Sequence, residues 1–411
     1  MGAMEPEFDP SELGFDADRL ARIDRHFAKY VDDERLPGWT IAITRHGRLA
    51  HLSHYGHADV EARQKVADDT IWRIYSMTKP ITSVAAMMLA EEGAFELKDP
   101  ISKYIPCFED MRVFSGGSAM RAETVPATEP IRVWHLLTHT SGLTYGFHHS
   151  HPVDALYRSA GFEWGTPPDM GNADVCTAWA QLPLLFEPGT EWNYGVSTDV
   201  LGHLVEVVSG QSLADFMQER IFEPLGMVDT GFHLEGEDRG RLAALYVPNP
   251  ADGKRLRFDG LGAVSSTTPK VLSGGGGLLS TVSDYLAFCD MLRRKGEYAG
   301  GHLLGSRTLE YMAENHLPGG VDLEAFGRPL FSETTFDGVG FGLGFAVVQD
   351  PVANKVPGSV GEFNWGGAAS TAFWIDPVED ITVVFLTQLL PSSTHPIRSQ
   401  LKALVHQALV D

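Results

Sequence analysis

The chain has 411 residues, of which 43% are hydrophobic and 21% are charged, so it can bury a large core and is not a disordered tail. Its 32 Lys and Arg against 54 Asp and Glu give a formal net charge of −22, which repels phosphate backbones and anionic lipid surfaces. No apolar run approaches the roughly 18 to 20 residues that cross a bilayer, so we expect neither a nucleic-acid nor a membrane partner.

The N-terminal residues and the cysteines both indicate a reducing compartment. Residues 1–15 are acidic and contain neither the basic region nor the apolar region of a secretory signal. The three cysteines, Cys107, Cys176 and Cys289, are odd in number and widely spaced, which excludes a disulfide framework and a CxxC metal site. We therefore expect a cytoplasmic protein with reduced cysteines.

The first elements along the chain are a helix and a β-hairpin. Residues 16–33 place apolar side chains three or four positions apart, as on one face of a helix, and Pro37 and Gly38 follow. Residues 39–44 and 48–55 alternate around a turn at His46 and Gly47, which predicts two antiparallel strands.

A buried helix is predicted next, from Pro80 to Glu92. Pro80 is tolerated in a first helical turn and Gly93 suits the position after the last turn, so Ser76 should lie at the N-terminal end of this helix. Near the other end of the chain, residues 371–375 and 381–387 predict a second hairpin, and an amphipathic helix follows from about 396 to 409.

The distribution of these elements predicts two lobes. Between about 97 and 261 the pattern is helical, with long loops and few strands, whereas strands cluster at both ends of the chain. We expect an α/β (α+β) lobe from residues 1–96 and 262–411, with an antiparallel sheet flanked by helices, and an inserted, mostly helical lobe from 97–261. The active site should lie in the cleft between them.

Ser76 and Lys79 are the first candidates for chemistry. Residues three apart share a helix face, so Lys79 can stand beside the Ser76 hydroxyl, which needs such a neighbour to become a nucleophile. The spacing is weak evidence alone, because Ser399 and Lys402 repeat it. Those two residues lie on an ordinary amphipathic helix, whereas Ser76 precedes an unusually apolar one.

Two further segments could complete a site. Tyr194 lies in a loop rich in turn residues, and a phenol beside Lys79 could take the proton of a serine. Residues 364–368 read Asn-Trp-Gly-Gly-Ala directly before a predicted strand. Glycines there let the backbone approach a ligand, and the N–H that follows can stabilise an oxyanion. Taken alone, each segment is equally compatible with a structural role.

Together these segments resemble the serine β-lactamase and penicillin-binding protein superfamily, and most closely the class C-like esterases called family VIII carboxylesterases. The similarity covers nearly the whole chain. Six segments carry it: Ser76 to Lys79, Trp134 to Leu143, Pro188 to Tyr194, Pro224 to Thr230, Gly274 to Thr281, and Trp365 to Gly367.

The resemblance implies a β-lactamase-like fold and specific site residues. Ser76, Lys79 and Tyr194 would be catalytic, and the backbone N–H groups of Ser76 and Ala368 would form the oxyanion hole. The residues expected to bind substrate are Trp365, Gly366, Gly367 and Val196.

Two departures from the β-lactamase pattern point to neutral esters. β-Lactamases carry Lys-Thr-Gly where this chain has Trp365-Gly-Gly, so the cation that would hold a substrate carboxylate is missing. They also have Asn at the position of Val196. The Trp-Gly-Gly replacement is what family VIII esterases show, and we expect Trp365 to line the pocket.

Other patterns are weaker. His135 and His139 could share a helix face, but no HExxH motif accompanies them, so we expect no metal and no cofactor. The glycines at 274–277 lack the Gly-Lys-Ser/Thr of a phosphate cradle and more simply pack backbone beside the active site. A GxSxG elbow is absent from the sequence, which leaves Ser76 without a rival nucleophile.

The sequence therefore predicts a serine carboxylesterase that hydrolyses small, short-chain esters through an acyl-enzyme on Ser76, with weak β-lactam hydrolysis as a side activity. A β-lactamase or DD-peptidase type of amide hydrolase, and an acyltransferase, are the alternatives. We expect a small-molecule ester as partner. The loops at 108–130, 147–170 and 234–269 should shape the pocket.

Overall fold

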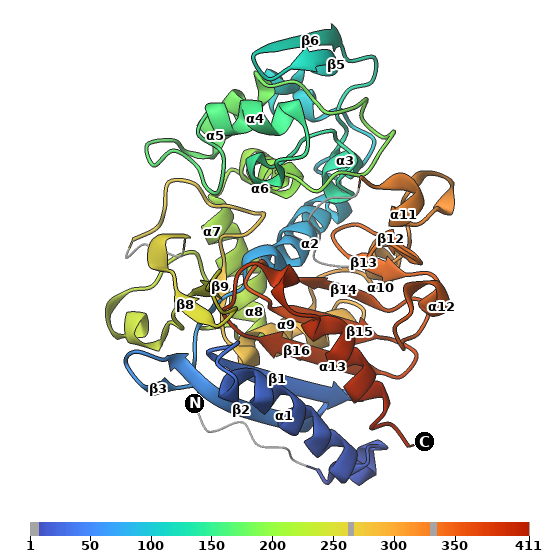
Figure 1. The fold of residues 1–411 in the computed structure, drawn as a ribbon. Helices are drawn as coiled ribbons and strands as arrows, with labels where there is room; N and C mark the ends of the chain where they lie inside the picture. The colour runs from blue at the N-terminus through green and yellow to red at the C-terminus, as the bar shows by residue number, and fades with distance from the viewer. Residues whose placement is uncertain (1–7, 262–266, 329–334, 411) are drawn as a thin grey trace.

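An eight-stranded antiparallel sheet organises the computed structural model, which describes residues 8–261, 267–328 and 335–410 (Figure 1). The strand order is β12-β13-β14-β15-β16-β1-β2-β3. The strands of this sheet are β1 (Gly38–Arg45), β2 (Arg48–Asp59), β3 (Gln64–Lys65), β12 (Val339–Phe341), β13 (Ala346–Val348), β14 (Phe363–Gly366), β15 (Ala372–Asp376) and β16 (Ile381–Leu386). Both predicted hairpins, β1–β2 and β15–β16, are confirmed.

The two ends of the chain meet in the middle of the sheet. Strand β1 pairs with β16 in a register that sets Thr40 opposite Leu386 and Arg45 opposite Ile381. This pairing joins the first hairpin to the last one, so the antiparallel sheet expected from the two termini is confirmed.

Both faces of the sheet are buried, which explains why its central strands read as continuous apolar runs. Val383 and Phe385 of β16 pack on one face against α1 and α13, and the Phe385 ring lies 5.3 Å from that of Phe27. Val384 and Leu386 alternate with them and enter the larger core on the opposite face, which α2 and α9 share.

The predicted helices are present: α1 and α13 are slightly shorter than predicted, and α2 begins two residues earlier, at Thr78. The residues proposed for 16–33, 80–92 and 396–409 form α1, α2 and α13. The helices in chain order are α1 (Ala17–Asp32), α2 (Thr78–Glu91), α3 (Val133–Leu137), α4 (Pro152–Ser159), α5 (Asn172–Ala180), α6 (Ser197–Ser209), α7 (Leu213–Met217), α8 (Glu223–Leu225), α9 (Val282–Arg293), α10 (Ser306–Met312), α11 (Leu323–Phe326), α12 (Pro351–Asn354) and α13 (Ile397–His406).

Helices α3 to α6 lie together at the end of the molecule drawn at the top of Figure 1, away from α1 and α13. A hairpin of β5 (Arg112–Ser118) and β6 (Arg121–Pro126) caps this end. The prediction of a loop at 108–130 was therefore wrong, because most of these residues form a β-hairpin. Gly116 and Gly117 and a bulge at Phe114 interrupt the alternation that would have marked the strand.

The remaining strands form two-stranded pairs: β4 (Trp72–Arg73) with β9 (Leu279–Ser280), β7 (Tyr246–Pro248) with β8 (Arg255–Arg257), and β10 (Glu297–Tyr298) with β11 (Gly301–His302). The N–H groups of Ala243 and Ala244 donate to the carbonyl oxygens of Ile71 and of Ala58 in β2, and the second of these bonds ties the segment before β7 to the large sheet. We proposed a boundary between the two lobes at residue 261. These contacts favour a boundary that lies earlier in the chain, before Ala243. Residues 262–266 of the pocket loop expected at 234–269 lie outside the described residues.

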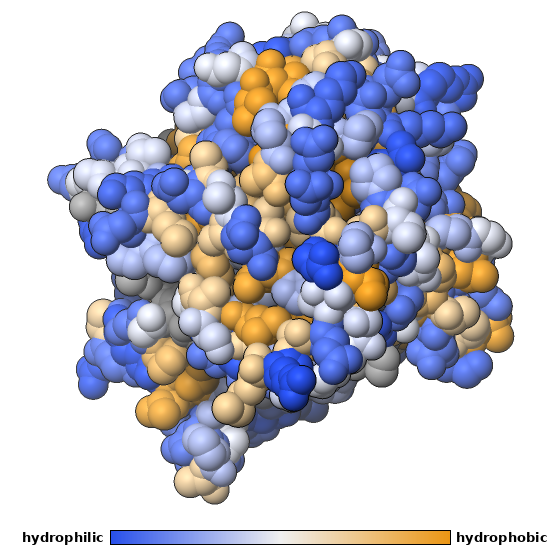
Figure 2. All heavy atoms as spheres, turned by 90° about the horizontal axis from the view of Figure 1, so that it is seen from above, coloured by the Kyte–Doolittle hydropathy of each residue, from blue (hydrophilic) through white to orange (hydrophobic). Residues whose placement is uncertain are grey.

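The face shown in Figure 2 is mostly hydrophilic, with apolar residues in scattered patches. Within the described ranges, no helix combines the length and the apolarity that crossing a bilayer requires.

Candidate active site

Ser76 lies in a short 3-10 turn, Tyr75–Met77, that leads directly into α2. The preceding residue, Tyr75, has a φ of +44°, a left-handed conformation that a bulky side chain rarely adopts. Such local strain persists where the surroundings hold it, and it occurs preferentially at functional sites. The expected location of Ser76 at the N-terminal end of a buried helix is confirmed.

Lys79 stands one turn further along and is only 2% exposed. Its Nζ donates to Ser76 Oγ at 3.3 Å, to the carbonyl oxygen of Gly275 at 2.7 Å and to the phenol oxygen of Tyr145 at 3.2 Å. It also lies 4.5 Å from the ring centre of Tyr194. The spacing argument from the sequence thus places the two side chains in contact, and the fold brings Tyr194 to them.

Neutral histidines hold Tyr194 in place. The Nε2 of His148 lies 2.7 Å from the Tyr194 carbonyl oxygen, so this nitrogen carries the proton and donates it. Burial lowers the pKa of His148. The ring of His139 packs 4.9 Å from that of Tyr194, and burial, with the nearby Lys79 cation, holds the pKa of His139 well below its usual value.

The glycines at 366 and 367 let the backbone before Ala368 come close to the serine turn. A Cβ on Gly367 would lie 2.4 Å from the carbonyl oxygen of Ile74, two residues before Ser76. Ala368 and Ser76 both line the same pocket. In the described part of the chain, no backbone carbonyl accepts from the N–H group of either residue. Both N–H groups are therefore available to a ligand.

Asp199, on the first turn of α6, fixes the loop that accepts from Lys79. Its Oδ1 accepts from the Gly275 N–H at 3.0 Å and from Ser273 Oγ at 2.5 Å. A Cβ on Gly275 would lie 2.4 Å from Asp199 Oδ2, so only glycine fits. Burial raises the pKa of Asp199, and the charge of Lys79 opposes this shift. The expectation that the glycine run packs tightly beside the site is confirmed.

Tyr145 and Asp199 are site residues that sequence reasoning missed. Tyr145 comes two residues after the segment that ends at Leu143, and its partner Lys79 is 66 positions away. Neither residue belongs to a local spacing pattern, so the sequence carried no signal beyond their nearness to those segments.

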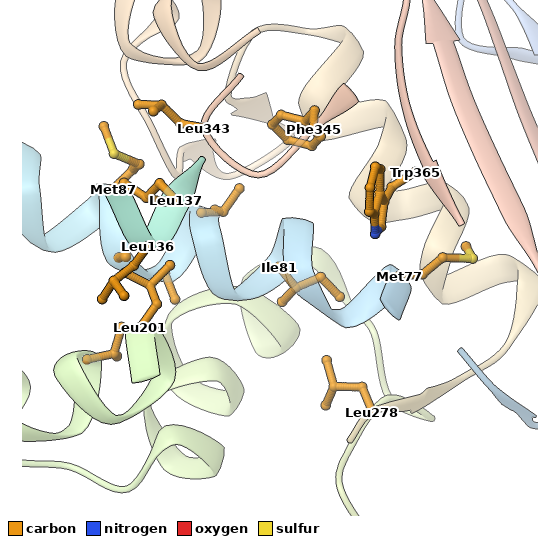
Figure 3. Close-up of a cluster of buried hydrophobic side chains, with 14 of the residues drawn as sticks. Met77, Ile81, Met87, Leu136, Leu137, Leu201, Leu278, Leu343, Phe345 and Trp365 are labelled. Carbon is orange, nitrogen blue, oxygen red and sulfur yellow. The ribbon is translucent and has the colours of Figure 1, made fainter. Parts of the chain in front are cut away.

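Trp365 does not lie where it was expected. Trp365 is 1% exposed and is not among the described residues that line the pocket. Gly366 and Gly367, which were also expected to bind substrate, are not in that lining either. The indole packs 5.5 Å from the Tyr194 ring and 5.3 Å from the Phe341 ring. Figure 3 draws it within the buried cluster that includes Met77 and Ile81. Trp365 therefore supports Tyr194 from the core, because its position on β14 directs it there.

The pocket has a volume of about 390 Å³, and seven of its described lining residues are aromatic. Of the expected substrate-binding residues, Val196 lines it. Phe147 and residues 162–166 belong to the predicted loop at 147–170, and no described residue of the loops at 108–130 and 234–269 contributes. The described residues that line it are Tyr75, Ser76, Tyr145, Phe147, Phe162, Glu163, Trp164, Gly165, Thr166, Trp179, Tyr194, Val196, Asp199, Val271, Ser273, Gly275, Gly276, Ala368, Leu390 and Pro391.

The weaker candidates have structural partners. His135 Nδ1 accepts from the Arg132 N–H at 3.0 Å, and burial lowers the His135 pKa to about 3. Across the described ranges, no cluster of three His, Cys, Asp or Glu side chains could hold a metal ion. Lys402 of the second SxxK pair forms an ion pair with the fully buried Glu362, and Ser399 donates to the carbonyl oxygen of Pro396.

Comparison with known proteins assigns the class. The Beta-lactamase family pattern matches residues 23–407, so the chain belongs to that family and is a serine hydrolase.

Among individual relatives, the chain is 36% identical over 360 residues to Protein Rv1367c of Mycobacterium tuberculosis, covering 87% of this chain and 86% of the relative. It is 30% identical over 398 residues to Esterase EstB of Burkholderia gladioli, covering 92% and 93%. A solved structure titled "EstCE1, a hydrolase with promiscuous acyltransferase activity" superposes with a TM-score of 0.78 at 27% identity, covering 98% and 99%. The family VIII resemblance and the β-lactamase-like fold are confirmed.

Proposed function

We propose that the chain is a carboxylesterase that acts on small neutral esters through an acyl-enzyme on Ser76. One observation carries the proposal: Lys79 Nζ lies 3.3 Å from Ser76 Oγ, at a pocket whose described lining contains no Lys or Arg side chain. The acidic side chains Glu163 and Asp199 line it instead. Such a pocket disfavours the carboxylate that β-lactam and peptide substrates carry.

In the first half of the reaction, Ser76 Oγ attacks the ester carbonyl carbon and passes its proton to the Lys79 and Tyr194 pair. The bond from the carbonyl carbon to the alcohol oxygen then breaks, and Tyr194 protonates the departing alcohol. In the second half, water attacks the acyl-enzyme, loses a proton to the same pair and releases the acid. Lys79 Nζ is the direct neighbour of Ser76 Oγ, at 3.3 Å, and its uncharged form is the one that can act as base.

The N–H groups of Ser76 and Ala368 would stabilise the oxyanion. Both residues line the pocket and neither N–H has a backbone acceptor in the described chain, which supports this role. Removal of one such donor typically costs about 3 kcal/mol of transition-state stabilisation. Because both donors are backbone groups, no single side-chain deletion abolishes them.

Acyl transfer is the second candidate. The volume of about 390 Å³ exceeds what a short acyl group needs and leaves room for an acceptor alcohol in place of water. A structural relative is itself titled as a hydrolase with promiscuous acyltransferase activity. An alcohol that attacks the same acyl-enzyme would give a new ester by the reverse of the first half-reaction.

The test compares p-nitrophenyl acetate with nitrocefin in three proteins. We expect fast ester turnover and slow or absent nitrocefin turnover in the wild type, and neither in Ser76→Ala. Ser399→Ala is the matched control and should keep full activity, since Ser399 is exposed, donates to the Pro396 carbonyl oxygen and is not in the described pocket lining. Ester turnover by folded Ser76→Ala would remove Ser76 from the mechanism. Dominant nitrocefin turnover would contradict the substrate class.

A further inference from the structure

A column of stacked rings leads outward from the active-site lysine. The Tyr145 ring stacks on Phe147 with centroids 4.7 Å apart and an interplanar angle of 18°. Phe147 stacks in turn on Trp164 at 4.7 Å and 9°. All three rings line the pocket. The Tyr145 hydroxyl is the end that contacts Lys79, so Trp164 is the outer end of the column.

Among the aromatic residues of the described pocket lining, Trp164 alone is exposed, at 50%. A large apolar side chain that is exposed at a pocket marks a surface that a ligand can cover. Phe147 already covers one side of the indole. The exposed remainder of Trp164 can extend the column by one more flat ring, and offset stacking is the arrangement that aromatic rings prefer.

The loop that presents Trp164 is anchored. Phe162, two residues earlier, is buried, its ring lies 5.6 Å from that of Trp179, and its N–H donates to the Tyr157 carbonyl at 2.9 Å. Glu163 is paired with His149 at 3.3 Å. Because the two residues directly before Trp164 are held in this way, less ordering is needed when a ligand binds.

The position of the column identifies which part of the substrate it meets. In the proposed reaction the alcohol oxygen must lie near the groups that move its proton, Lys79 and Tyr194. Tyr145 contacts both: its hydroxyl accepts from Lys79 at 3.2 Å, and its ring lies 5.5 Å from that of Tyr194. The substituent on the alcohol oxygen therefore lies closer to the column than to Ala368, where the carbonyl oxygen is held.

We propose that Phe147 and Trp164 form a subsite for an uncharged aromatic ring on the alcohol side of the ester, so that arylmethyl alcohols are preferred leaving groups and preferred acyl acceptors. This inference rests on the proposed function, because it uses the acyl-enzyme on Ser76. The acidic neighbours Glu163 and Asp199 set the charge requirement, since a carboxylate on the ring would be repelled.

The first test measures how one acyl-enzyme divides between two alcohols. Vinyl acetate acetylates Ser76, releasing vinyl alcohol that becomes acetaldehyde. Benzyl alcohol or cyclohexylmethanol then attacks the acetyl carbon, gives its proton to the Lys79 and Tyr194 pair, and restores the Ser76 hydroxyl. The two alcohols have the same carbon skeleton, and only benzyl alcohol has a flat ring. Equal concentrations compete in one vessel, and the ratio of the two acetate esters is read by chromatography.

In the wild type we expect benzyl acetate to exceed cyclohexylmethyl acetate by roughly fivefold or more. Trp164→Ala should bring the ratio close to one, and Trp164→Phe should keep most of it. The ratio is taken within each protein, so a change in overall turnover cancels. Tyr311→Ala, which truncates an exposed ring outside the pocket, is the control and should keep the wild-type ratio. 4-(Hydroxymethyl)benzoate should be a poor acceptor.

The second test needs no catalysis. Saturation-transfer NMR of benzyl alcohol with Ser76→Ala should show binding, and adding Trp164→Ala should weaken it severalfold. Two results would overturn the subsite and leave the proposed function in place. In one, the wild type is acetylated but shows no preference for benzyl alcohol over cyclohexylmethanol; in the other, the preference persists in Trp164→Ala. Absence of any acetyl-enzyme, with binding of benzyl alcohol still dependent on Trp164, would overturn the proposed function and leave the subsite standing.

Discussion

The ammonium group of Lys79 and the phenol oxygen of Tyr145 are 3.2 Å apart, although 66 positions separate the two residues in the chain. This contact gives the lysine a phenol partner in addition to Tyr194, whose ring centre lies 4.5 Å from Nζ. Two phenols around one amine raise the question of which of them moves the proton.

We expect Tyr194→Phe to lower kcat for a short-chain ester by about 10²- to 10⁴-fold, as loss of a general acid and base does. Phenylalanine keeps the ring that packs on Trp365, so the fold should persist. Tyr145→Phe should have a smaller effect, because it removes one acceptor of Lys79 and leaves Ser76 and Gly275 in place. Steady-state kinetics of the two variants measures both effects on kcat, and circular dichroism checks that each variant is folded. The opposite ranking would assign the proton transfer to Tyr145.

A second prediction concerns the charge of Asp199. Asp199→Asn can still accept from the Gly275 N–H but has no charge, so the ammonium form of Lys79 loses a favourable interaction. If neutral Lys79 is the base, the acidic limb of the kcat profile moves to lower pH. Ser273→Ala removes the other side-chain partner of Asp199 without changing its formal charge and is the control. A uniform fall in kcat with no movement of the limb would mean that Asp199 only shapes the loop.

The second SxxK pair should matter for stability and not for activity. Lys402→Met leaves the buried carboxylate of Glu362 without its cation and should lower the free energy of unfolding by about 3 to 5 kcal/mol. The double variant with Glu362→Met should recover most of this loss, since both charges are then gone. Urea titration measures the free energy of unfolding of the single and the double variant. Ser399→Ala should stay within about 0.5 kcal/mol of the wild type, and lost esterase activity in a folded Lys402→Met protein would contradict this assignment.

Asp284 should make stability fall as the pH rises. Burial raises its pKa to about 6 from 3.8. Between these values the unfolded chain loses the proton while the folded protein keeps it, so ionisation favours the unfolded state. The contribution is fully present below about pH 4 and is lost by about pH 6, and it amounts to about 3 kcal/mol at most.

Asp284→Asn tests this contribution, because the amide can still accept from the Asp229 N–H and the Thr230 hydroxyl. We expect the variant to show a flatter decline in unfolding free energy from pH 4 to 6.5 than the wild type. Denaturant titrations at four pH values would measure the difference, and parallel curves for the two proteins would contradict the pKa shift.

Local patterns in the sequence were sufficient where the structure itself is local. Ser76 and Lys79 meet because they are one helical turn apart, and the two hairpins form from adjacent segments. Trp365 shows the limit. Alternation along β14 tells which side chains share a face, but what covers that face depends on α2 and on Tyr194, which come from elsewhere in the chain. The same dependence hid Tyr145 and Asp199, whose partners lie far away in sequence.

The pairing of β1 with β16 has a consequence for how the chain is made. Thr387 Oγ1 donates to the Gly38 carbonyl oxygen across 349 positions. Strand β1 of the first hairpin therefore cannot pair with β16 until the intervening residues have left the ribosome. Ala368 is also translated almost 300 residues after Ser76. The nucleophile therefore leaves the ribosome well before its oxyanion donor, and the nascent chain cannot acquire hydrolytic competence until Ala368 has followed.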